Sequence, residues 1–500
     1  MPRHRTGSAS RSMYRILFAA SEAHPLIKTG GLADVAGSLP PALSSLGCDV
    51  RLIMPAYRDA VAHAPHPRRL IDIELDGSGM RVALLETLLP GTAIKTWLVD
   101  YPPAFDRPGN PYLDSTGRPW PDNAERFDLF ARAICAIARG NTPLSWRPEL
   151  VHCNDWQTGL VPALLASEQP RPATVFTVHN LAYQGLFPYA KLKDLQLPHA
   201  WWSSEALEFH GQLSFIKGGL VYADYLTTVS PTYAREIQTP AHGAGLDGLL
   251  RHRSRRLVGI LNGIDDRIWN PATDVHLVKT FNQRRLADKS ENKLALQQQV
   301  GLERAAQTPL LAFIGRAVEQ KGIDVVLDAL PQLLHMPLQS FLLTGGGPKY
   351  EQTLQRLAEQ YPTRLAVHIG HDEELAHRIY GGADMLLMPS RFEPCGLSQL
   401  YSMRYGTVPV VHRVGGLVDT VVDADDSNIA TGNATGIVFR ELTVTALLAA
   451  IERACALYRQ AALWKKLARS GMRHSRSFGW RMSAARYLAL YRQLIPGPRA

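Results

Sequence analysis

The sequence predicts an α/β protein built from two Rossmann-like, doubly wound domains. Short apolar or β-branched runs alternate with helix-length segments, and this rhythm occurs in both halves of the chain. Strands that alternate with helices form parallel sheets with both faces covered by helices. One sheet holding all of these strands would be large for a chain of 500 residues, so two domains are favoured over one.

The expected strands can be given in chain order. The first half contains RILFAA (15–20), DVRLIMP (49–55), LVHCND (150–155) and TVFTVHN (174–180). The second half contains PLLAFIGR (309–316), SFLLTGGG (340–347), LAVHIG (365–370), ADMLLMPS (383–390) and TVPVVHR (407–413). The tract SAARYLALYRQLI (483–495) has helical spacing, and the domains divide near GILNGIDDRIWNP (259–271).

Composition indicates a soluble globular protein. Hydrophobic residues make up 46% of the chain and charged residues 20%, and no apolar stretch approaches the roughly 20 residues of a membrane span. The basic, polar residues 1–12 are expected to be a disordered lead-in, and Met13 is an alternative start of the protein. The five cysteines have no paired spacing, which favours neither disulfides nor zinc and predicts a cytoplasmic protein.

The net charge of +9 raises the question of a nucleic-acid partner. The cations are spread along the chain, and the densest cluster, RHRSRR (251–256), lacks the interleaved aromatic residues of a strand-binding groove. We therefore expect that cluster to be a solvated loop, with no nucleic-acid partner. Positive charge also suits an anionic small molecule.

The stretch KTGGLADV (28–35) follows the first expected strand. Ligands of doubly wound folds bind beyond the carboxyl ends of strands, where glycines let backbone N–H groups approach a phosphate at a helix N-terminus. Gly30 and Gly31 occupy such a position, and Lys28 can add a positive charge. A tight strand-to-helix turn with a surface lysine is equally compatible, because the pattern is neither G-x-G-x-x-G nor a P-loop.

The second half supplies further residues at strand ends. Arg316 and Lys321 follow a strand in FIGRAVEQKG, where two cations can grip a diphosphate. Gly345–Gly347 form a glycine loop after the next strand, and Glu393 lies in a turn before a helix. VGGLVDTV (414–421) repeats the pattern of KTGGLADV (28–35). Their shared location at strand ends favours a binding site over unrelated loops.

These motifs together resemble those of the bacterial glycogen synthases, relatives of plant starch synthases. The resemblance runs from about Tyr14 to the C-terminal helix and rests on SEAHPLIKTGGLADVAGSLP, YLDSTGRPWPDNAERF, HCNDWQTGLVPALL, TVHNLAYQG, GLDGLL, LNGIDDRIWNP, GRAVEQKG and PSRFEPCGLSQLYSMRYGTVPVV. It implies the glycosyltransferase B fold, with two domains that face each other across a deep cleft. The implied parts are the lead-in (1–12), an acceptor-side domain (13–261), a donor-side domain (262–479) and a C-terminal helix crossing back to the first domain (480–500).

The resemblance also implies a reaction, the transfer of glucose from ADP-glucose to the non-reducing 4-OH of an α-1,4-glucan with retained anomeric configuration. Arg316 and Lys321 match the residues with which the family binds the diphosphate. Lys28, Gly30 and Gly31 would close over the same group from the other domain. Cations placed there would stabilise the charge that develops on the leaving group.

Several other residues match family positions. Glu393 matches the essential acid beside the donor glucose, and His179 matches the histidine near the reacting sugar. A helix-capping role for Glu393 and a structural hydrogen bond for His179 are the alternatives. The remaining matches are the nucleotide-binding residues His371, Gly396 and Leu397, and the substrate-binding residues Asp155, Trp156, Asn180, Asn262 and Cys395.

Three positions distinguish this chain within the wider group. His371 stands where the family usually has a tyrosine that stacks on adenine, and Asn154 stands where a histidine is common. Tyr401 occupies the position at which sucrose and trehalose-phosphate transferases often carry a second glutamate.

A UDP-sugar transferase making a small product and an inactive glucan-binding regulator are the alternative functions. No metal and no cofactor are expected.

Overall fold

The computed structural model describes residues 13–75 and 79–495, which form two compact units. Unit 1 contains the described residues up to Thr228, Ile237–Ile260 and the residues from Ser483 on. Unit 2 contains Val229–Glu236 and Leu261–Met482. The predicted lead-in, residues 1–12, lies outside the described residues. The sequence did not anticipate that Val229–Glu236 belongs to unit 2.

Unit 1 is built on a nine-stranded sheet in the order β12-β11-β7-β6-β1-β2-β5-β4-β3. The strands are β1 (Arg15–Ala19), β2 (Asp49–Pro55), β3 (Arg68–Glu74), β4 (Arg81–Leu88), β5 (Lys95–Asp100), β6 (Leu150–Asn154), β7 (Ala173–Val178), β11 (Tyr225–Thr228) and β12 (Leu257–Gly259). The four predicted strands are confirmed as β1, β2, β6 and β7. The pairs β3–β4 and β4–β5 are antiparallel and extend the parallel part of the sheet at one edge.

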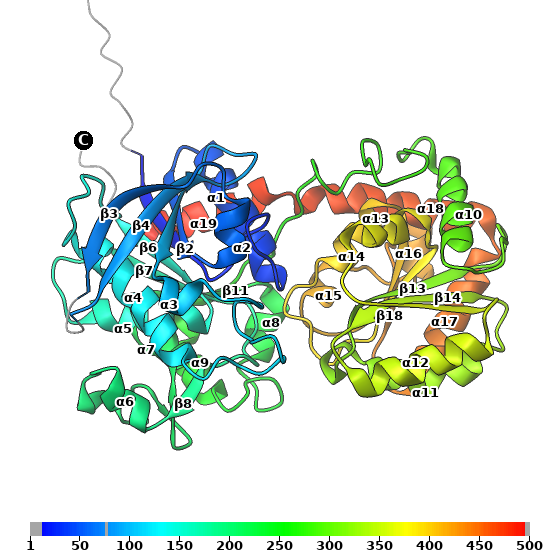
Figure 1. Cartoon of the computed structure of the whole chain (residues 1–500). Helices are drawn as coiled ribbons and strands as arrows, with labels where there is room; N and C mark the ends of the chain where they lie inside the picture. The colour runs from blue at the N-terminus through cyan, green and yellow to red at the C-terminus, as the bar shows by residue number, and fades with distance from the viewer. Residues whose placement is uncertain (1–12, 76–78, 496–500) are drawn as a thin grey trace, which may run out of the picture. The chain divides into compact units, whose positions relative to one another are not determined.

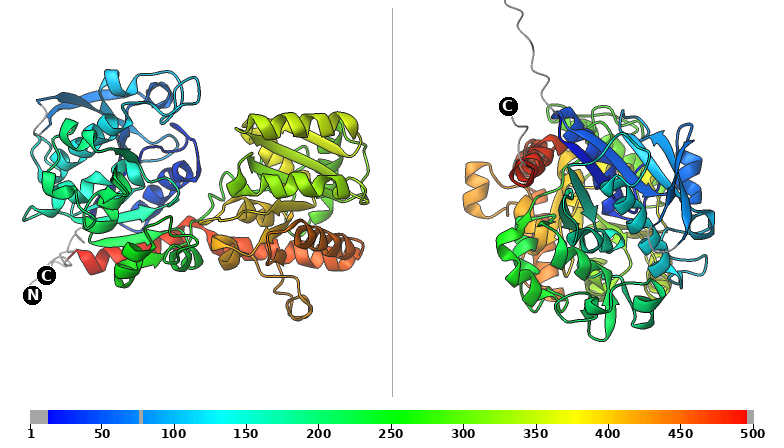
Figure 2. Two further views of the ribbon diagram at one scale, coloured as in Figure 1. Left: turned by 90° about the horizontal axis from the view of Figure 1, so that it is seen from below. Right: turned by 90° about the vertical axis from the view of Figure 1, so that its left-hand side faces the viewer.

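Helices and a small second sheet complete unit 1. The helices are α1 (Gly31–Ser45), α2 (Arg58–His63), α3 (Pro102–Phe105), α4 (Asn123–Arg139), α5 (Leu160–Ala166), α6 (Ala190–Asp194), α7 (Phe215–Tyr222) and α9 (Asp247–His252). The small sheet has β10 (Gln212–Ser214) between β8 (Leu186–Pro188) and β9 (Glu208–Phe209). In Figure 1, α6 and β8 lie beyond α5 and α7, on the side of the unit away from α1 and α2, and Figure 2 gives two further views.

Unit 2 is a parallel sheet in the order β15-β14-β13-β16-β17-β18. The strands are β13 (Leu310–Arg316), β14 (Gln339–Gly345), β15 (Leu365–Ile369), β16 (Met385–Met388), β17 (Val408–His412) and β18 (Ile437–Phe439). The five predicted strands are confirmed as β13 to β17. All of these strands are nearly continuous apolar runs, as expected for a parallel sheet covered on both faces.

The helices of unit 2 cover both faces of this sheet. Figure 1 shows α11 (Ile323–Leu333) and α12 (Pro348–Gln360) on one side, and α13 (Glu373–Gly382) and α14 (Ser398–Arg404) on the other. The remaining helices are α8 (Pro231–Glu236), α10 (Lys289–Gln299), α15 (Gly415–Thr420), α16 (Asp426–Thr431), α17 (Val444–Tyr458) and α18 (Ala461–His474). The fold class is therefore as predicted: two doubly wound α/β units.

The predicted C-terminal helix is confirmed as α19 (Trp480–Leu494). Its residues from Ser483 on belong to unit 1, where Tyr491 shares a hydrogen bond of 2.6 Å with Nδ1 of the buried His152 on β6. The other ring nitrogen of His152 lies 2.6 Å from the Thr177 hydroxyl on β7. These two bonds attach the last helix to the centre of the unit 1 sheet.

Both sheets have a point at which the strand order reverses. In unit 1 the chain runs from β1 to β2 on one side and later places β6 on the other side of β1. In unit 2 it runs from β13 to β14 and β15, and then places β16 on the other side of β13. Ligands of doubly wound sheets bind at the carboxyl ends of the strands that flank such a point.

No helix within 13–75 and 79–495 combines the length and the apolar character needed to cross a membrane.

Candidate active site

The centre of the unit 2 site is an ion pair across the switch point of its sheet. Lys321 follows β13 and Glu393 follows β16, and Lys321 Nζ donates to Glu393 Oε2 at 2.6 Å. Ser390 Oγ donates to the same oxygen at 2.9 Å. Among the described residues none donates a hydrogen bond to Oε1 of Glu393, so the second carboxylate oxygen is available to a ligand.

Two glycines explain how the Glu393 loop is held. Gly416 donates its N–H to the carbonyl oxygen of Glu393 at 2.9 Å. A Cβ on Gly415, whose φ is +47°, would lie 1.9 Å from that oxygen, and a Cβ on Gly416 would lie 2.1 Å from the carbonyl oxygen of Cys395. The glycines of VGGLVDTV therefore let the start of α15 pack against the loop that carries Glu393.

Further predicted residues lie at the same edge of the unit 2 sheet. Arg316 is the last residue of β13, is exposed, and is paired in register with Gly345 at the end of β14. The stem of Lys321 passes within 3.7 Å of where a Cβ on Gly315 would lie. His371 is exposed in the loop after β15, and Asp372 beside it caps α13 by accepting the N–H of Leu375. The register of three parallel strands thus brings Arg316, Lys321 and His371 to one edge.

The turn after Glu393 contains the other predicted residues of this unit. Cys395 is buried, and burial raises the pKa of its thiol to about 12, so it stays a neutral thiol. The backbone N–H of Asn262 bonds that sulfur, while the buried Asn262 Oδ1 has no hydrogen-bond donor among the described residues. Gly396 and Leu397 lead into α14, and Gly396 has a φ of +70°.

Tyr401 has a structural role. Its ring stacks on Trp269 with the ring centroids 3.9 Å apart and an angle of 19° between the planes, and Trp269 stacks on His377 on its other face. Both Tyr401 and Trp269 are buried. A carboxylate at position 401 would be desolvated within this aromatic stack, which accounts for the absence of a second glutamate here.

In unit 1, the stretch KTGGLADV (28–35) is hydrogen-bonded to a buried glutamate. Glu22, just after β1, accepts the backbone N–H of Thr29 at 2.5 Å and the Thr29 hydroxyl at 2.9 Å. Tyr112 donates to the other oxygen of Glu22 at 3.3 Å and shares a 2.7 Å bond with Ser21. Burial raises the pKa of Glu22 to about 7. This network fixes the loop that carries Lys28.

Lys28 pairs with Asp34 in the first turn of α1, with Nζ and Oδ1 2.9 Å apart. Asp34 therefore binds the lysine from the first turn of α1. Gly30, the residue before α1, has an extended backbone with φ of −161°, and a Cβ on Gly30 or Gly31 would meet no atom within 4 Å. The fold itself does not require glycine at these positions, so their small size leaves room for a ligand close to the backbone.

His179 lies at the end of β7 and is buried. Its Nε2 lies 2.9 Å from Asn154 Oδ1, while Asn154 Nδ2 donates to the carbonyl oxygen of Ala19 at 2.9 Å. The second bond identifies the Asn154 oxygen as the atom facing His179, so Nε2 carries the proton and Nδ1 is an acceptor. Burial lowers the pKa of His179 to about 3, which keeps the ring neutral. Asn154 thus selects the tautomer of His179.

Asp155 connects the ends of β6 and β7. Its Oδ1 accepts the backbone N–H of His179 at 2.7 Å, and the N–H of Asn180 also bonds the carboxylate. Its backbone has φ 55° and ψ −178°, a region that costs a non-glycine residue roughly 1–3 kcal/mol. Burial raises the pKa of Asp155 to about 7. Asp155 therefore orients the His179 loop from a strained position.

Trp156 is half-buried in an aromatic cluster. Its ring lies 4.9 Å from Phe127 and 5.9 Å from Phe187, measured between centroids, and Gly185 lies so close that a Cβ there would be 2.4 Å from the indole. Asn180 uses its Oδ1 to accept the N–H of Ala182 at 3.1 Å. The structure thus gives Trp156 a packing role and Asn180 a turn-forming role, and leaves their predicted substrate contacts as predictions.

Three residues that contact these predicted positions were not singled out in the sequence. Glu22 holds the Thr29 loop, Tyr112 binds Glu22, and Ser390 binds Glu393. Glu22 lies within the motif SEAHPLIKTGG and was discoverable as a carboxyl near a glycine loop. Tyr112 is 90 residues from Glu22 along the chain, and nothing local indicates that contact.

The raised pKa of Asp155 leads to a testable pH dependence. Between about pH 4 and pH 7 folded Asp155 keeps its proton while the unfolded chain loses it, so this carboxyl lowers the stability as the pH rises. Asp155→Asn removes that effect. We expect the free energy of unfolding of the variant, relative to wild type, to rise by about 1 kcal/mol per pH unit from pH 5 to pH 7.

Denaturant unfolding followed by tryptophan fluorescence measures this difference. Asp59→Asn is the matched control, because Asp59 is an exposed carboxylate on α2 of the same unit. A difference between Asp155→Asn and wild type that stays constant with pH would show that Asp155 is ionised in the folded protein at pH 5.

Comparisons with known proteins agree with this geometry. Residues 15–252 match the starch synthase catalytic domain, and residues 297–470 match the glycosyl transferases group 1 domain. Glycogen synthase 1 of Methylococcus capsulatus is 54% identical over 97% of this chain and 98% of its own length. The chain belongs to the bacterial glycogen synthase family. It is accordingly a glycosyltransferase with the glycosyltransferase B architecture.

Other members and a solved structure extend the comparison. The glycogen synthase of Cellvibrio japonicus is 54% identical over 96% of this chain and all of its own length. The catalytic domain of starch synthase IV from Arabidopsis thaliana, bound to ADP and acarbose, has a TM-score of 0.86 and 31% identity, covering 97% of this chain and 99% of its own. Membership of the glycogen synthase family does not favour a small-product UDP-sugar transferase or an inactive regulator.

Proposed function

We propose that this protein elongates glycogen by transferring glucose from ADP-glucose to the non-reducing 4-OH of an α-1,4-glucan, with retained anomeric configuration. The names of its relatives and the ADP and acarbose in the Arabidopsis structure support this reaction class. The observation that carries the proposal is the Lys321–Glu393 pair at the switch point of the unit 2 sheet. It places a cation and a carboxylate where doubly wound folds bind nucleotides.

The cations act on the leaving group in this proposal. When the bond between the anomeric carbon and the diphosphate oxygen breaks, both bonding electrons stay on the diphosphate. Lys321 has three N–H donors and gives one to Glu393, so two remain for phosphate oxygens. Arg316, the last residue of β13 and five positions before Lys321, is the second proposed contact to the diphosphate. These charges stabilise the transition state more than the ground state.

Glu393 acts on the glucose. Its Oε2 is held by Lys321 and Ser390, which orients Oε1 toward a ligand. A fixed carboxylate stabilises the positive charge that develops at the anomeric centre and accepts a hydrogen bond from a sugar hydroxyl. The buried Asn262 Oδ1, which lacks a donor among the described residues, is a second proposed acceptor for a hydroxyl.

In this proposal, unit 1 supplies a hydrogen-bond acceptor and a phosphate-binding loop. The Nδ1 of neutral His179 accepts a hydrogen bond from a sugar hydroxyl, and Asn154 keeps the ring in the tautomer with the proton on Nε2. Lys28, Gly30 and Gly31 are proposed ligands of the donor phosphates, supported by the unobstructed space around the two glycines. The exposed His371 is the proposed stacking partner of the nucleotide base.

We further propose that the reaction needs no metal and proceeds in a reducing compartment. The five cysteines are all buried and unpaired, the pattern of a protein that is not exposed to oxidising conditions. Removal of divalent cations with EDTA is then expected to leave the rate unchanged.

The decisive assay measures incorporation of labelled glucose into glycogen from ADP-glucose and, in parallel, from UDP-glucose, each with and without EDTA. We expect strong transfer from ADP-glucose, insensitive to EDTA. Transfer mainly from UDP-glucose would overturn the proposed donor and would indicate that His371 changes recognition of the nucleotide base. Loss of activity in EDTA, restored by Mg²⁺, would overturn the metal-free proposal, and no transfer from either donor would overturn the function.

A further inference from the structure

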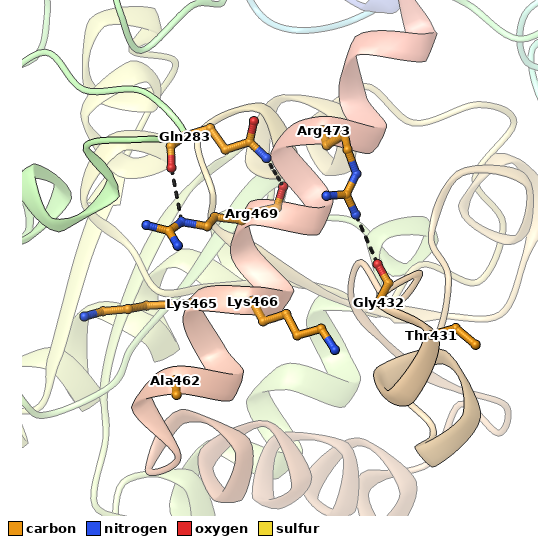
Figure 3. A pocket seen from close by; sticks show the side chains of 8 residues that line it. All are labelled: Gln283, Thr431, Gly432, Ala462, Lys465, Lys466, Arg469 and Arg473. Carbon is orange, nitrogen blue, oxygen red and sulfur yellow. Dashed lines mark hydrogen bonds between the residues drawn. The ribbon is translucent and has the colours of Figure 1, made fainter.

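Unit 2 has a basic pocket formed by helix α18, the end of α16 and the loop before α10. The pocket has a volume of about 700 Å³ and is lined by Gln283, Thr431, Gly432, Ala462, Lys465, Lys466, Arg469 and Arg473. Figure 3 shows Lys465 and Arg469 extending from α18 on the side of Gln283, and Lys466 and Arg473 on the side of Gly432. We propose that this pocket binds a small phosphorylated anion.

The charges in the pocket are not balanced by carboxylates. None of the eight lining residues is acidic, and none of these four side chains forms an ion pair with another residue that the structure describes. Lys465 and Arg469, and likewise Arg469 and Arg473, are four residues apart on α18, a spacing at which like charges repel and destabilise a helix. A bound anion would convert this repulsion into attraction.

Hydrogen bonds to backbone carbonyls hold three of these side chains at the wall of the pocket. Lys466 Nζ donates to the carbonyl oxygen of Ile429 at 3.0 Å, and an Arg473 Nη donates to that of Gly432 at 3.1 Å. Arg469 Nε donates to the carbonyl oxygen of Gln283 at 3.2 Å. These bonds cap the end of α16 and the loop, but each occupies only part of the donors of its side chain. The remaining N–H groups are positioned to bind oxyanions.

The shape and composition of the pocket favour a small ligand. A volume of about 700 Å³ lies within the range of small-molecule sites. No lining residue is aromatic, so the pocket has no stacking surface for nucleobases. Two pairs of cations suit an anion with more than one negative charge, such as a phosphate ester, and arginine forks match phosphate oxygens in geometry.

Calorimetric titration of the full chain with pyrophosphate tests the proposal. The measurement uses the background variant Lys321→Met, so that binding at the proposed donor site is weakened. We expect saturable binding that falls at least tenfold when Lys465→Ser and Arg469→Gln are added, and likewise when Lys466→Ser and Arg473→Gln are added. Circular dichroism and the melting temperature verify that each variant is folded.

The matched control removes two cations from the basic cluster of unit 1 at residues 251–256, with Arg255→Gln and Arg256→Gln. The loop expected there is not observed, because residues 251 and 252 end α9 and Ser254–Arg256 form a short 3-10 helix. These arginines are exposed and do not line the pocket, so this variant is expected to bind pyrophosphate as the background variant does. Three outcomes would overturn the proposal: no saturable binding in the background variant, unchanged binding in both pocket variants, or an equal loss in the control, which would indicate a general effect of net charge.

Discussion

Glu393→Gln is expected to lower the rate of glucose transfer by about 10³-fold, because the change removes a fixed negative charge beside the reacting carbon. Glutamine has nearly the same shape, and its oxygen can still accept from Ser390 or Lys321. The neutral amide cannot stabilise positive charge at the anomeric centre. The expected effect is therefore on kcat, with a smaller change in the KM for ADP-glucose.

Initial-rate kinetics with ADP-glucose and glycogen measure this effect, and circular dichroism verifies the fold. Lys321, the partner left behind, has a side chain that is 24% exposed and stays hydrated, so little loss of stability is expected. Glu374→Gln is the matched control, since Glu374 is an exposed glutamate of α13 in the same unit. Retention of most activity by Glu393→Gln would remove Glu393 from the residues that act on the sugar.

Lys321→Met is expected to reduce kcat/KM for ADP-glucose by about 10²-fold while leaving the KM for glycogen unchanged. Methionine keeps an unbranched apolar stem that can pass Gly315 as the lysine stem does, but it has no charge for the diphosphate. The substitution also frees Glu393 from its 2.6 Å partner, which adds to the loss in kcat.

Kinetics at varied ADP-glucose and then at varied glycogen separate the two substrates. Lys279→Met is the control, because Lys279 is exposed and precedes α10 in the same unit. A separate variant, Lys321→Arg, tests whether the shape of the cation matters. The planar guanidinium fork does not replace a compact ammonium group at a fitted site, so we expect this variant also to lose activity. A higher KM for glycogen with unchanged donor kinetics would contradict a diphosphate contact for Lys321.

The local pattern of the sequence determined the strands that carry the site. The runs that became β1, β6, β7, β13 and β16 are apolar and end in glycine or polar residues, and this pattern depends only on neighbouring residues. Lys28, Asp155, His179, Lys321 and Glu393 could therefore be placed at strand ends from sequence. Their expected chemistry followed from residue type and from the family resemblance.

The sequence missed elements whose signal is weak or non-local. The antiparallel strands β3 and β4 alternate less clearly, with several half-buried or exposed positions, and they join the sheet only as an extension beyond β5. The segment Val229–Glu236 belongs to unit 2 through contacts such as Thr232 with Asp419, which is 187 residues away. Patterns of local hydrophobicity contain no information about such pairs.

What the sequence alone determined, then, is the alternation of strands and helices and the identity of the charged and glycine residues at strand ends. Only the tertiary structure decided the strand order, and with it the pairing of Lys321 with Glu393 across 72 residues and of Asn154 with His179 across 25. It also decided that the glycines at 415 and 416 serve packing while those at 30 and 31 leave open space. The physical reason is that hydrogen bonds and close packing depend on distances in space, which a linear pattern does not specify.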